Sequence, residues 1–256
     1  MQLRWIALHE IRIIPLQTET LVTRNTDLGK LLVKSMKNQA IPLQHDDIIV
    51  ITHKIVSKAE GRVINKRDIT VSERAESIAE REDFDAHQVE LALRESEKII
   101  REKRALITLN KNGQICNFAG VDHSNAPRNS YVLLPANPDE SALRLRQRVG
   151  ELTGKEPAII ITDTEGRPWR KGAINLAIGC AGINAFKYNK NRPDLYGEVL
   201  KRSTVCQVDQ LASAAELVMG QADESVPVAI IRGYPYEKGE EQVSDIYRSA
   251  ENDLFR

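Results

Sequence analysis

Short apolar runs recur along the chain and are separated by polar segments. Runs of this kind, bounded by polar or turn-forming residues, are typical of buried strands. They cover residues 48–51, 105–109, 131–134, 158–161 and 226–231. The pattern therefore predicts five core strands that are spread over most of the chain.

Helical spacing of apolar residues predicts helices between these strands. The first is expected to begin after Asp85, which is placed as its N-cap. Its inward-facing residues are then Val89, Leu93, Ile99 and Ile100. Strands mixed with helices indicate an α/β or α+β protein, and the irregular connections do not form a regular βαβ series.

Two further helices are predicted in the second half of the chain. One begins near Asp139 and has Leu143, Val149 and Leu152 on its apolar side. The other covers residues 207–219. The small and apolar residues that suit it to close packing are Ala212, Ala214, Ala215, Leu217 and Val218. Residues 188–202 and 234–241 are predicted to be loops, and residues 244–255 a final helix.

The charge balance limits the classes of function. The 256 residues include 36 lysines and arginines and 36 aspartates and glutamates, so the chain has no general attraction to nucleic acid or to an anionic membrane. Any phosphate site must come from locally placed charge. The N-terminus is not signal-like, and no apolar run approaches the roughly 20 residues of a membrane helix. These features favour a cytoplasmic protein of one large domain or two lobes.

The three cysteines add little chemistry. Cys116, Cys180 and Cys206 are odd in number, widely spaced and without a CxxC pair. A disulfide framework or a thiolate zinc site is therefore not expected, and a reducing cytoplasm fits. We expect these residues to be small buried packing groups.

The most informative segment follows the apolar run at 158–161. Asp163 and Thr164 stand at the end of that predicted strand, and oxygen ligands of this kind suit Mg²⁺ or Mn²⁺. A glycine turn and three cations follow, namely Arg167, Arg170 and Lys171. A metal ligand beside cations fits phosphoryl transfer, in which charge neutralisation and positioning dominate. A capped turn with a solvated basic face is the alternative.

Three other segments could carry chemistry. Asp122, Ser124 and Asn125 form a short polar loop that suits a cation or a ligand, or simply an Asx-type turn. Lysines after the run at 48–51 could hold phosphates, although Lys58 could also form a surface ion pair with Glu60. At the end of the helix at 207–219, a glycine C-cap precedes a glutamine that could supply a carbonyl ligand.

Several common nucleotide and catalytic motifs are missing from the sequence. There is no GxxxxGK[ST] loop, since residues 153–155 lack the upstream glycine. The GxGxxG, GxSxG and HExxH patterns are missing as well. A bound nucleotide would therefore need a less common architecture.

Together, these segments resemble the coenzyme F-420 γ-glutamyl ligase family over nearly the whole chain. The matching segments, in family order, are residues 14–16, 55–62, 119–122 with 124–125, 161–164 with 166–167, 194–197, 216–220, 228–233 and 246–249. The resemblance implies a two-lobed α+β fold particular to the family, rather than a P-loop, Rossmann or ATP-grasp fold. It also implies a single ligase domain over residues 1–256 with two interleaved lobes and no fused reductase domain.

The resemblance further implies a reaction. GTP would phosphorylate the terminal carboxylate of the glutamate-free coenzyme, and the amine of L-glutamate would attack the acyl phosphate. Further glutamates would be added through γ-linkages. Two Mg²⁺ or Mn²⁺ ions, a potassium ion and a homodimer are also implied, with small molecules rather than nucleic acid or membrane as partners.

The resemblance also assigns site residues. Asp122 and Asp163 are implied to hold one divalent ion, and Thr164 and Gln221 the second. The residues implied to contact GTP are Ile14, Pro15, Leu16, Gln17, His53, Lys54, Lys58, Asn125, Met219, Gly220, Gln221, Ala222, Asp223, Glu224, Ser225 and Val226. The catalytic residues are expected to be Asp163, Lys58 and Arg167.

The sequence departs from the family pattern in places. His53 and Lys54 stand where small hydroxyl residues are expected, and Gln221 where a glutamate is an alternative. Asn129 and Asn191 occupy loop positions where glycine is expected, and asparagine tolerates a positive φ better than most residues. Two other functions remain open: the same ligase chemistry on a variant precursor, and a nucleotide- or metal-binding regulatory protein without turnover.

Overall fold

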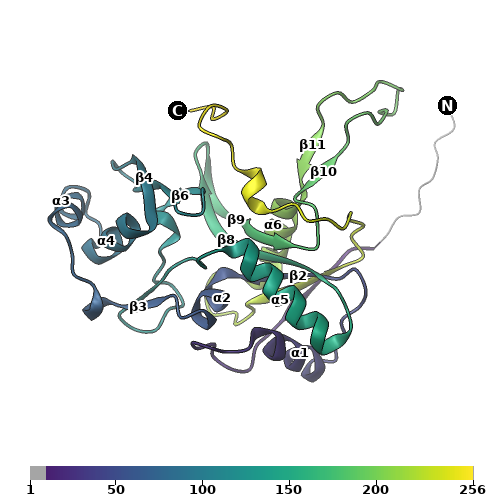
Figure 1. Cartoon of the computed structure of the whole chain (residues 1–256), viewed down its shortest axis with the longest axis horizontal. Helices are drawn as coiled ribbons and strands as arrows, with labels where there is room; N and C mark the ends of the chain where they lie inside the picture. The colour runs from purple at the N-terminus through teal and green to yellow at the C-terminus, as the bar shows by residue number, and fades with distance from the viewer. Residues whose placement is uncertain (1–9, 256) are drawn as a thin grey trace.

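Three of the apolar runs form neighbouring strands of one central sheet. The computed structural model describes residues 10–255. The order of the sheet is β1 (Arg12–Leu16), β12 (Val228–Arg232), β2 (Ile48–Thr52), β8 (Ala158–Arg167) and β9 (Arg170–Ala181) (Figure 1). Strands β2 and β8 are parallel, and the other neighbours are antiparallel. The mixture of helices and small sheets confirms the predicted α+β class.

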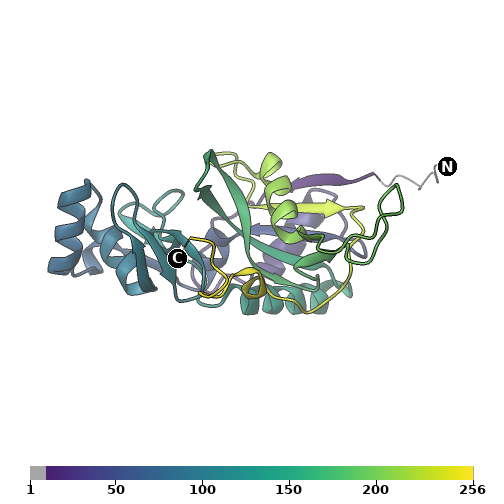
Figure 2. The same ribbon diagram turned by 90° about the horizontal axis from the view of Figure 1, so that it is seen from above.

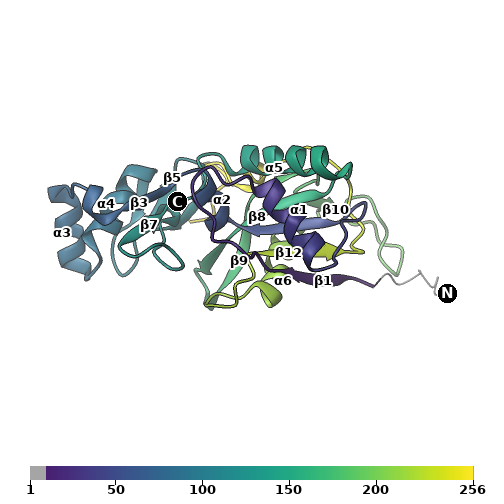
Figure 3. The ribbon, with the colours of Figure 1, turned by 90° about the horizontal axis from the view of Figure 1, so that it is seen from below.

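Helices cover both faces of this sheet. Helices α1 (Leu28–Asn38) and α5 (Pro138–Thr153) lie on one face and α6 (Gln207–Met219) on the other (Figure 3). Ile49 and Ile159 point to the first face, and Ile48 and Ile160 to the second. Since both faces are buried, the strands are continuous apolar runs and do not alternate with polar residues.

A second lobe extends from one end of the central sheet (Figure 2). It contains α3 (Glu73–Glu82), α4 (Ala86–Glu95), the sheet β4 (Ser96–Arg101), β5 (Ile107–Asn110) and β6 (Ile115–Asn117), and the pair β3 (Val63–Asn65) and β7 (Ser130–Val132). A separate core that includes Ile78, Val89 and Leu106 stabilises it. The chain enters this lobe after α2 (His53–Ala59) and leaves it before α5.

The predicted loops are confirmed. Residues 189–203 connect β10 (Phe186–Tyr188) to β11 (Thr204–Cys206), one residue later than the predicted 188–202. Residues 234–241 contain no helix or strand. Asn191 in the β10–β11 connection and Asn129, directly before β7, have φ values of 67° and 55°, so both use the positive φ that asparagine tolerates. Short 3₁₀ helices cover Lys66–Asp68, Phe118–Gly120 and Val243–Ile246.

The predicted helix after Asp85 is shorter than expected. Asp85 is the N-cap of α4 and accepts hydrogen bonds from the backbone N–H groups of His87 and Gln88. The helix ends at Glu95, so placing Ile99 and Ile100 on it was wrong. Both residues belong to β4, which pairs with β5, and this pairing prevails over the helical spacing.

Three residues expected inside helical packing are exposed. Helix α5 turns Ala142, Leu145 and Val149 to the core, which leaves Leu143 and Leu152 42% and 37% exposed. Leu217 of α6 is 83% exposed because Ala212, Ala215 and Met219 form the buried side of that helix.

The predicted final helix over residues 244–255 was also wrong. Only the 3₁₀ helix Val243–Ile246 forms there. The buried carboxylate of Asp139 accepts hydrogen bonds from the backbone N–H groups of Val243 and Ser244. These tertiary contacts hold the backbone at Val243 and Ser244, and they prevail over the helical propensity of the segment.

The cysteines are packing residues, as predicted. Cys116 and Cys180 are buried, Cys206 is half-buried, and all three are free thiols. Separately, none of the helices formed by residues 10–255 has the length and apolar character needed to cross a bilayer.

One buried ion pair at the sheet margin makes a stability prediction. Arg232 Nε and Nη2 each lie 2.8 Å from an oxygen of Asp47, which is fully buried. We expect Arg232→Met to lower the free energy of unfolding by about 3 kcal/mol, because it leaves Asp47 buried without its cation. Urea denaturation measures this loss.

Arg12 provides the matched control. It lies directly across from Arg232 in the β1–β12 pair, but its partner Glu10 is exposed. Arg12→Met should therefore leave the unfolding midpoint unchanged. An equal loss of stability in both variants would contradict the assigned role of Asp47.

Candidate active site

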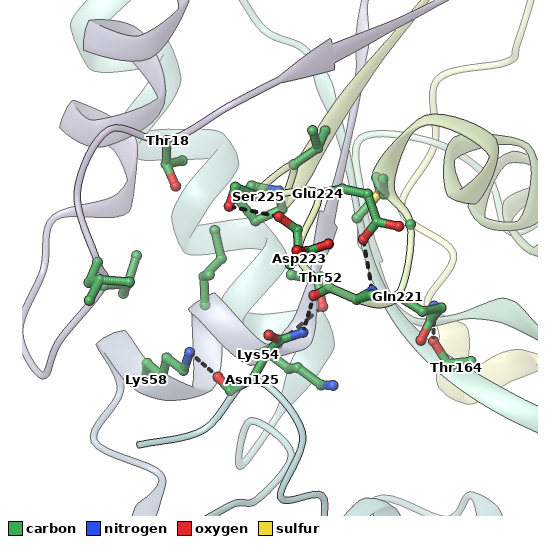
Figure 4. A pocket seen from close by; sticks show the side chains of 18 of the residues that line it. Thr18, Thr52, Lys54, Lys58, Asn125, Thr164, Gln221, Asp223, Glu224 and Ser225 are labelled. Atoms are coloured by element: carbon green, nitrogen blue, oxygen red, sulfur yellow. Dashed lines mark hydrogen bonds between the residues drawn. The ribbon is translucent and has the colours of Figure 1, made fainter. Parts of the chain in front are cut away.

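A cavity of about 310 Å³ opens at the ends of β2 and α6, beside Asp163 and Thr164 of β8 (Figure 4). Its lining comes from segments that are far apart in the sequence. These are residues 18–22, Thr52, Lys54, Ile55, Lys58, Asn125, Asp163, Thr164, Asn175, Glu216 and residues 219–227. The pocket therefore joins both halves of the chain at one edge of the central sheet.

The parallel pairing of β2 and β8 explains why these segments meet. Thr52, the last residue of β2, lies opposite Thr162, so the parallel pairing of the two strands ends there. The chain continues from Thr52 into α2, which carries Lys54 and Lys58. Strand β8 continues through Asp163 and Thr164 to Arg167, so the predicted strand end and glycine turn after Thr164 were wrong, because pairing with β9 extends the strand. Ligand sites often form outside the carboxyl ends of parallel strands, where functional side chains converge.

Two lysines stand one helical turn apart on α2 and face the pocket. Lys58 Nζ donates a hydrogen bond of 2.6 Å to the backbone oxygen of Asn125 (Figure 4). Burial, together with the positive charge of Lys54, lowers the pKa of Lys58. No ion pair joins Lys58 to Glu60, which instead pairs with Arg144, so the surface-pair alternative for Lys58 does not hold within the described chain.

Asp122 pairs with the other lysine. Lys54 Nζ lies 2.7 Å from Asp122 Oδ2, and Ser124 donates to the same carboxylate through its backbone N–H and its hydroxyl. Burial raises the pKa of Asp122, but these donors outweigh burial and hold it at about 2. The loop is thus an Asx-type turn. The carboxylate of Asp122 is ionised and pairs with the ammonium group of Lys54.

The carboxylate of Asp163 contacts the ring of a buried histidine, His53. His53 is 1% exposed, and its Nε2 lies 3.2 Å from Asp163 Oδ1 without forming a hydrogen bond. The backbone N–H of Thr164 donates to the same carboxylate at 2.7 Å. His53 does not line the pocket, so the structure places it behind Asp163 rather than against a ligand.

Thr164 and Gln221 belong to a polar network with two residues that the sequence did not single out. Gln221 Nε2 donates to Thr164 Oγ1 at 2.8 Å and also to Glu216. Thr164 Oγ1 donates to Asn175 Oδ1 at 2.6 Å. Burial, together with the charge of Glu224, raises the pKa of Glu216. The only advance signal was the place of Glu216 in a family-like segment. Asn175 comes opposite Thr164 only through the pairing of β8 with β9.

The loop after α6 lines the pocket throughout. Gly220 ends the helix with φ of 70°, as its C-cap position predicts. Asn125 Nδ2 donates to the backbone oxygen of Ala222 at 3.0 Å, and the N–H of Ala222 donates to Glu224 at 2.7 Å. All the predicted contacts from 219 to 226 therefore lie at the cavity.

Two other predicted groups lie outside the lining. Residues 14–17 form the end of β1 and the start of the next turn, and the cavity begins only at Thr18. Arg167 lies near the tip of the β8–β9 hairpin, where Nη2 donates to the backbone oxygens of Lys171 and Gly172 at 3.3 and 3.1 Å. Its guanidinium therefore stabilises the hairpin turn.

A further carboxylate follows Thr164 but lines a different cavity. Glu165, with Asp209 and Tyr247, lines a second space of about 330 Å³ and accepts a hydrogen bond from Gln114. Burial, together with the charge of Asp163, raises the pKa of Glu165 to about 8. No sequence motif pointed to this group.

The donor atoms in the first pocket fit hard cations. Within residues 10–255 no three His, Cys, Asp or Glu side chains gather as a metal cluster. Asp163, Thr164 and Gln221 line the pocket, whereas Asp122 lies outside the lining and pairs with Lys54, which does line it. The candidate ligands are thus two single carboxylates, one hydroxyl and one amide. Such oxygen sets suit Mg²⁺ or Mn²⁺, which take their remaining ligands from phosphates and water.

Comparison with known families identifies the group of proteins to which this fold and pocket belong. A family model described as F420-0:Gamma-glutamyl ligase matches residues 17–233, and every residue that lines the first pocket falls within that match. The chain belongs to this family. The resemblance inferred from the sequence motifs is therefore confirmed.

Curated members of the family match nearly the whole chain. A protein named "Coenzyme F420:L-glutamate ligase" from Methanopyrus kandleri is 43% identical over 251 residues, which cover 96% of this chain and 98% of that protein. Proteins of the same name from Methanothermobacter thermautotrophicus and Archaeoglobus fulgidus are 41% and 37% identical. Each comparison covers 96% of this chain, with 99% and 96% of the respective relative.

The pair between Lys54 and Asp122 predicts a change in titration. Lys54→Met removes the cation that lowers the pKa of Asp122, so this pKa should rise from about 2. In the unsubstituted protein the pair contributes stability above the usual pKa of 3.8, and this contribution is lost as the pH falls toward 2. Carboxyl ¹³C NMR titration measures the shift.

A second pair serves as the control for this titration. Asp85 also has a pKa of about 2, in part through Lys66. Lys66→Met should raise the pKa of Asp85 and leave that of Asp122 unchanged. A pKa of Asp122 that stays near 2 in Lys54→Met would contradict the assigned pair.

Proposed function

We propose that this protein is a cytoplasmic, GTP-dependent coenzyme F420:L-glutamate ligase. It joins L-glutamate to the glutamate-free coenzyme and then adds further glutamates through γ-linkages. Identity of 37–43% across nearly the full length of relatives with the corresponding name carries this proposal. The pocket supports it, because lysines and carboxylates meet there in one cavity.

The proposed reaction has two steps. A carboxylate oxygen of the coenzyme precursor attacks the γ-phosphorus of GTP, the bond to the bridging oxygen breaks, and GDP leaves. The amine of L-glutamate then attacks the acyl carbon, phosphate leaves with the bonding electrons, and the nitrogen loses a proton to give the amide. Both steps need charge neutralisation at phosphate oxygens.

The residues of the first pocket, with Asp122 beside Lys54, would divide this work. Lys54 and Lys58 would bind nucleotide phosphates, because both reach the cavity from α2. Asp122 and Asp163 would hold one divalent ion, and Thr164 and Gln221 a second. These ions would supply electrostatic stabilisation of the transferring phosphoryl group. We assign no step to Arg167, and potassium and a homodimer remain part of the proposal on the resemblance alone.

A product-mass assay tests the function. Purified full-length protein is mixed with the glutamate-free coenzyme, L-glutamate, GTP and Mn²⁺, and the product is analysed by mass spectrometry. We expect a mass increase of one or more glutamyl units that requires GTP and is stopped by a chelator. An unchanged mass with GTP still bound would reject this substrate and favour a variant precursor or a regulatory protein.

Asp163→Asn tests the catalytic use of the pocket. We expect a loss of kcat of roughly 100-fold or more, since a neutral amide cannot balance divalent charge at the transferring phosphate. Circular dichroism and the Tm should remain close to those of the unsubstituted protein. Asp68→Asn, at an exposed carboxylate in the second lobe, is the matched control and should retain full turnover. Normal turnover of Asp163→Asn would contradict the assignment.

A further inference from the structure

Three side-chain oxygens converge on one point of the first pocket. Thr164 Oγ1 and Asn175 Oδ1 lie 2.8 and 3.5 Å from Gln221 Nε2, and Glu216 Oε1 accepts a hydrogen bond from the same nitrogen. They come from three elements, β8, β9 and α6. A hydroxyl, an amide carbonyl and a carboxylate thus surround one electropositive group, as they would surround a hard cation.

Asn175 fixes the direction of the carboxylate. Its Nδ2 donates to Glu216 Oε2 at 2.5 Å and to Thr162 Oγ1 at 3.3 Å, while its Oδ1 accepts from Thr164. Asn175 is buried, with 3% exposure, so its amide cannot easily turn elsewhere. Orientation of ligands by buried hydrogen-bond partners is a common feature of metal sites.

The surroundings of Glu216 disfavour an ionised carboxylate unless a cation is bound there. Glu216 stands in the last turn of α6, where the partial negative charge of the helix end disfavours a carboxylate. Glu224 adds a second negative charge nearby, and its effect exceeds that of the positive charge of Lys54. Within the described residues no lysine, arginine or histidine forms an ion pair with Glu216. Neutral donors alone, from Asn175 and Gln221, therefore contact this carboxylate.

We propose that Glu216 supplies the carboxylate ligand of the second divalent cation, with Asn175 as a carbonyl ligand beside Thr164. The proposal rests on the GTP-dependent function proposed above. It explains why this position can hold the neutral Gln221 instead of a glutamate. The negative charge comes from Glu216, five positions earlier. The amide of Gln221 then rotates to present its oxygen, or leaves the cation to the other three donors.

Manganese binding to the full-length protein in the presence of GDP tests this assignment. Titration followed by electron paramagnetic resonance gives the number of Mn²⁺ ions per chain and their dissociation constants. We expect two ions for the unsubstituted protein. In Glu216→Gln, one of the two should bind roughly ten-fold or more weakly, because a charged ligand is lost. Glu97→Gln, at an exposed carboxylate of β4, should bind both ions normally.

A charge-swapped double variant separates ligation from structural support. Combining Glu216→Gln with Gln221→Glu keeps one carboxylate and one amide in contact but exchanges their positions. It should restore the weakened Mn²⁺ site to within about three-fold of the original. A purely structural Glu216 would instead lower the Tm in the single variant while both Mn²⁺ ions still bind. That outcome would overturn the proposal.

The two proposals fail in different ways. If the unsubstituted protein forms no glutamylated product but the Mn²⁺ results are as expected, the ligase function is wrong and the cation ligand stands. If product forms while Glu216→Gln binds two Mn²⁺ ions with unchanged affinity, the ligase function stands and the ligand assignment is wrong. If Glu216→Gln does not fold, Asn175→Ala provides the second variant and should weaken the same ion.

Discussion

The parallel pairing of β2 and β8 is the constraint on which the pocket depends. Only a parallel pair brings the carboxyl ends of two strands to the same edge, and only there can Lys54 and Asp163 come from separate parts of the chain to one cavity. The crossover between the two strands is long enough to contain the whole second lobe and α5. Asp122 belongs to this crossover, so the same connection that makes β2 and β8 parallel also places a carboxylate against Lys54, which lines the pocket.

Burial of both faces of the sheet fixes the register of β2 against β8, and this register fixes the positions of the site residues. The strands β2 and β8 carry isoleucine on each side, and a shift by one residue would exchange the side chains under α5 with those under α6. Packing on α6 also sets where that helix ends, and Gly220 then turns the chain across the cavity. The hydrophobic core therefore positions polar groups that contribute little to it.

The sequence predicted the parts of the fold that depend on local signals. Buried strands, the Asp85 N-cap and the Gly220 C-cap were found because apolar runs and capping residues act over short distances. Ile99 and the segment 244–255 were misassigned because strand pairing and the carboxylate of Asp139 act from distant positions. The network of Asn175 and Glu216 was missed for the same reason, since only the folded sheet places an asparagine of β9 against a glutamate of α6.

The charges at the pocket show how a chain of zero net charge could carry out the proposed phosphate chemistry. A pocket with lysines alone would bind phosphate but would repel a divalent ion, and one with carboxylates alone would do the reverse. Here Lys54 and Asp122 neutralise each other at 2.7 Å, while Glu216 accepts hydrogen bonds from neutral amides and forms no ion pair within the described residues. The two carboxylates therefore differ: a cation at Asp122 must compete with Lys54, whereas a cation at Glu216 displaces only an amide. Under the proposed function, a metal–nucleotide complex carries both signs of charge. Its phosphates would interact with the lysines and its metal ions with the carboxylates.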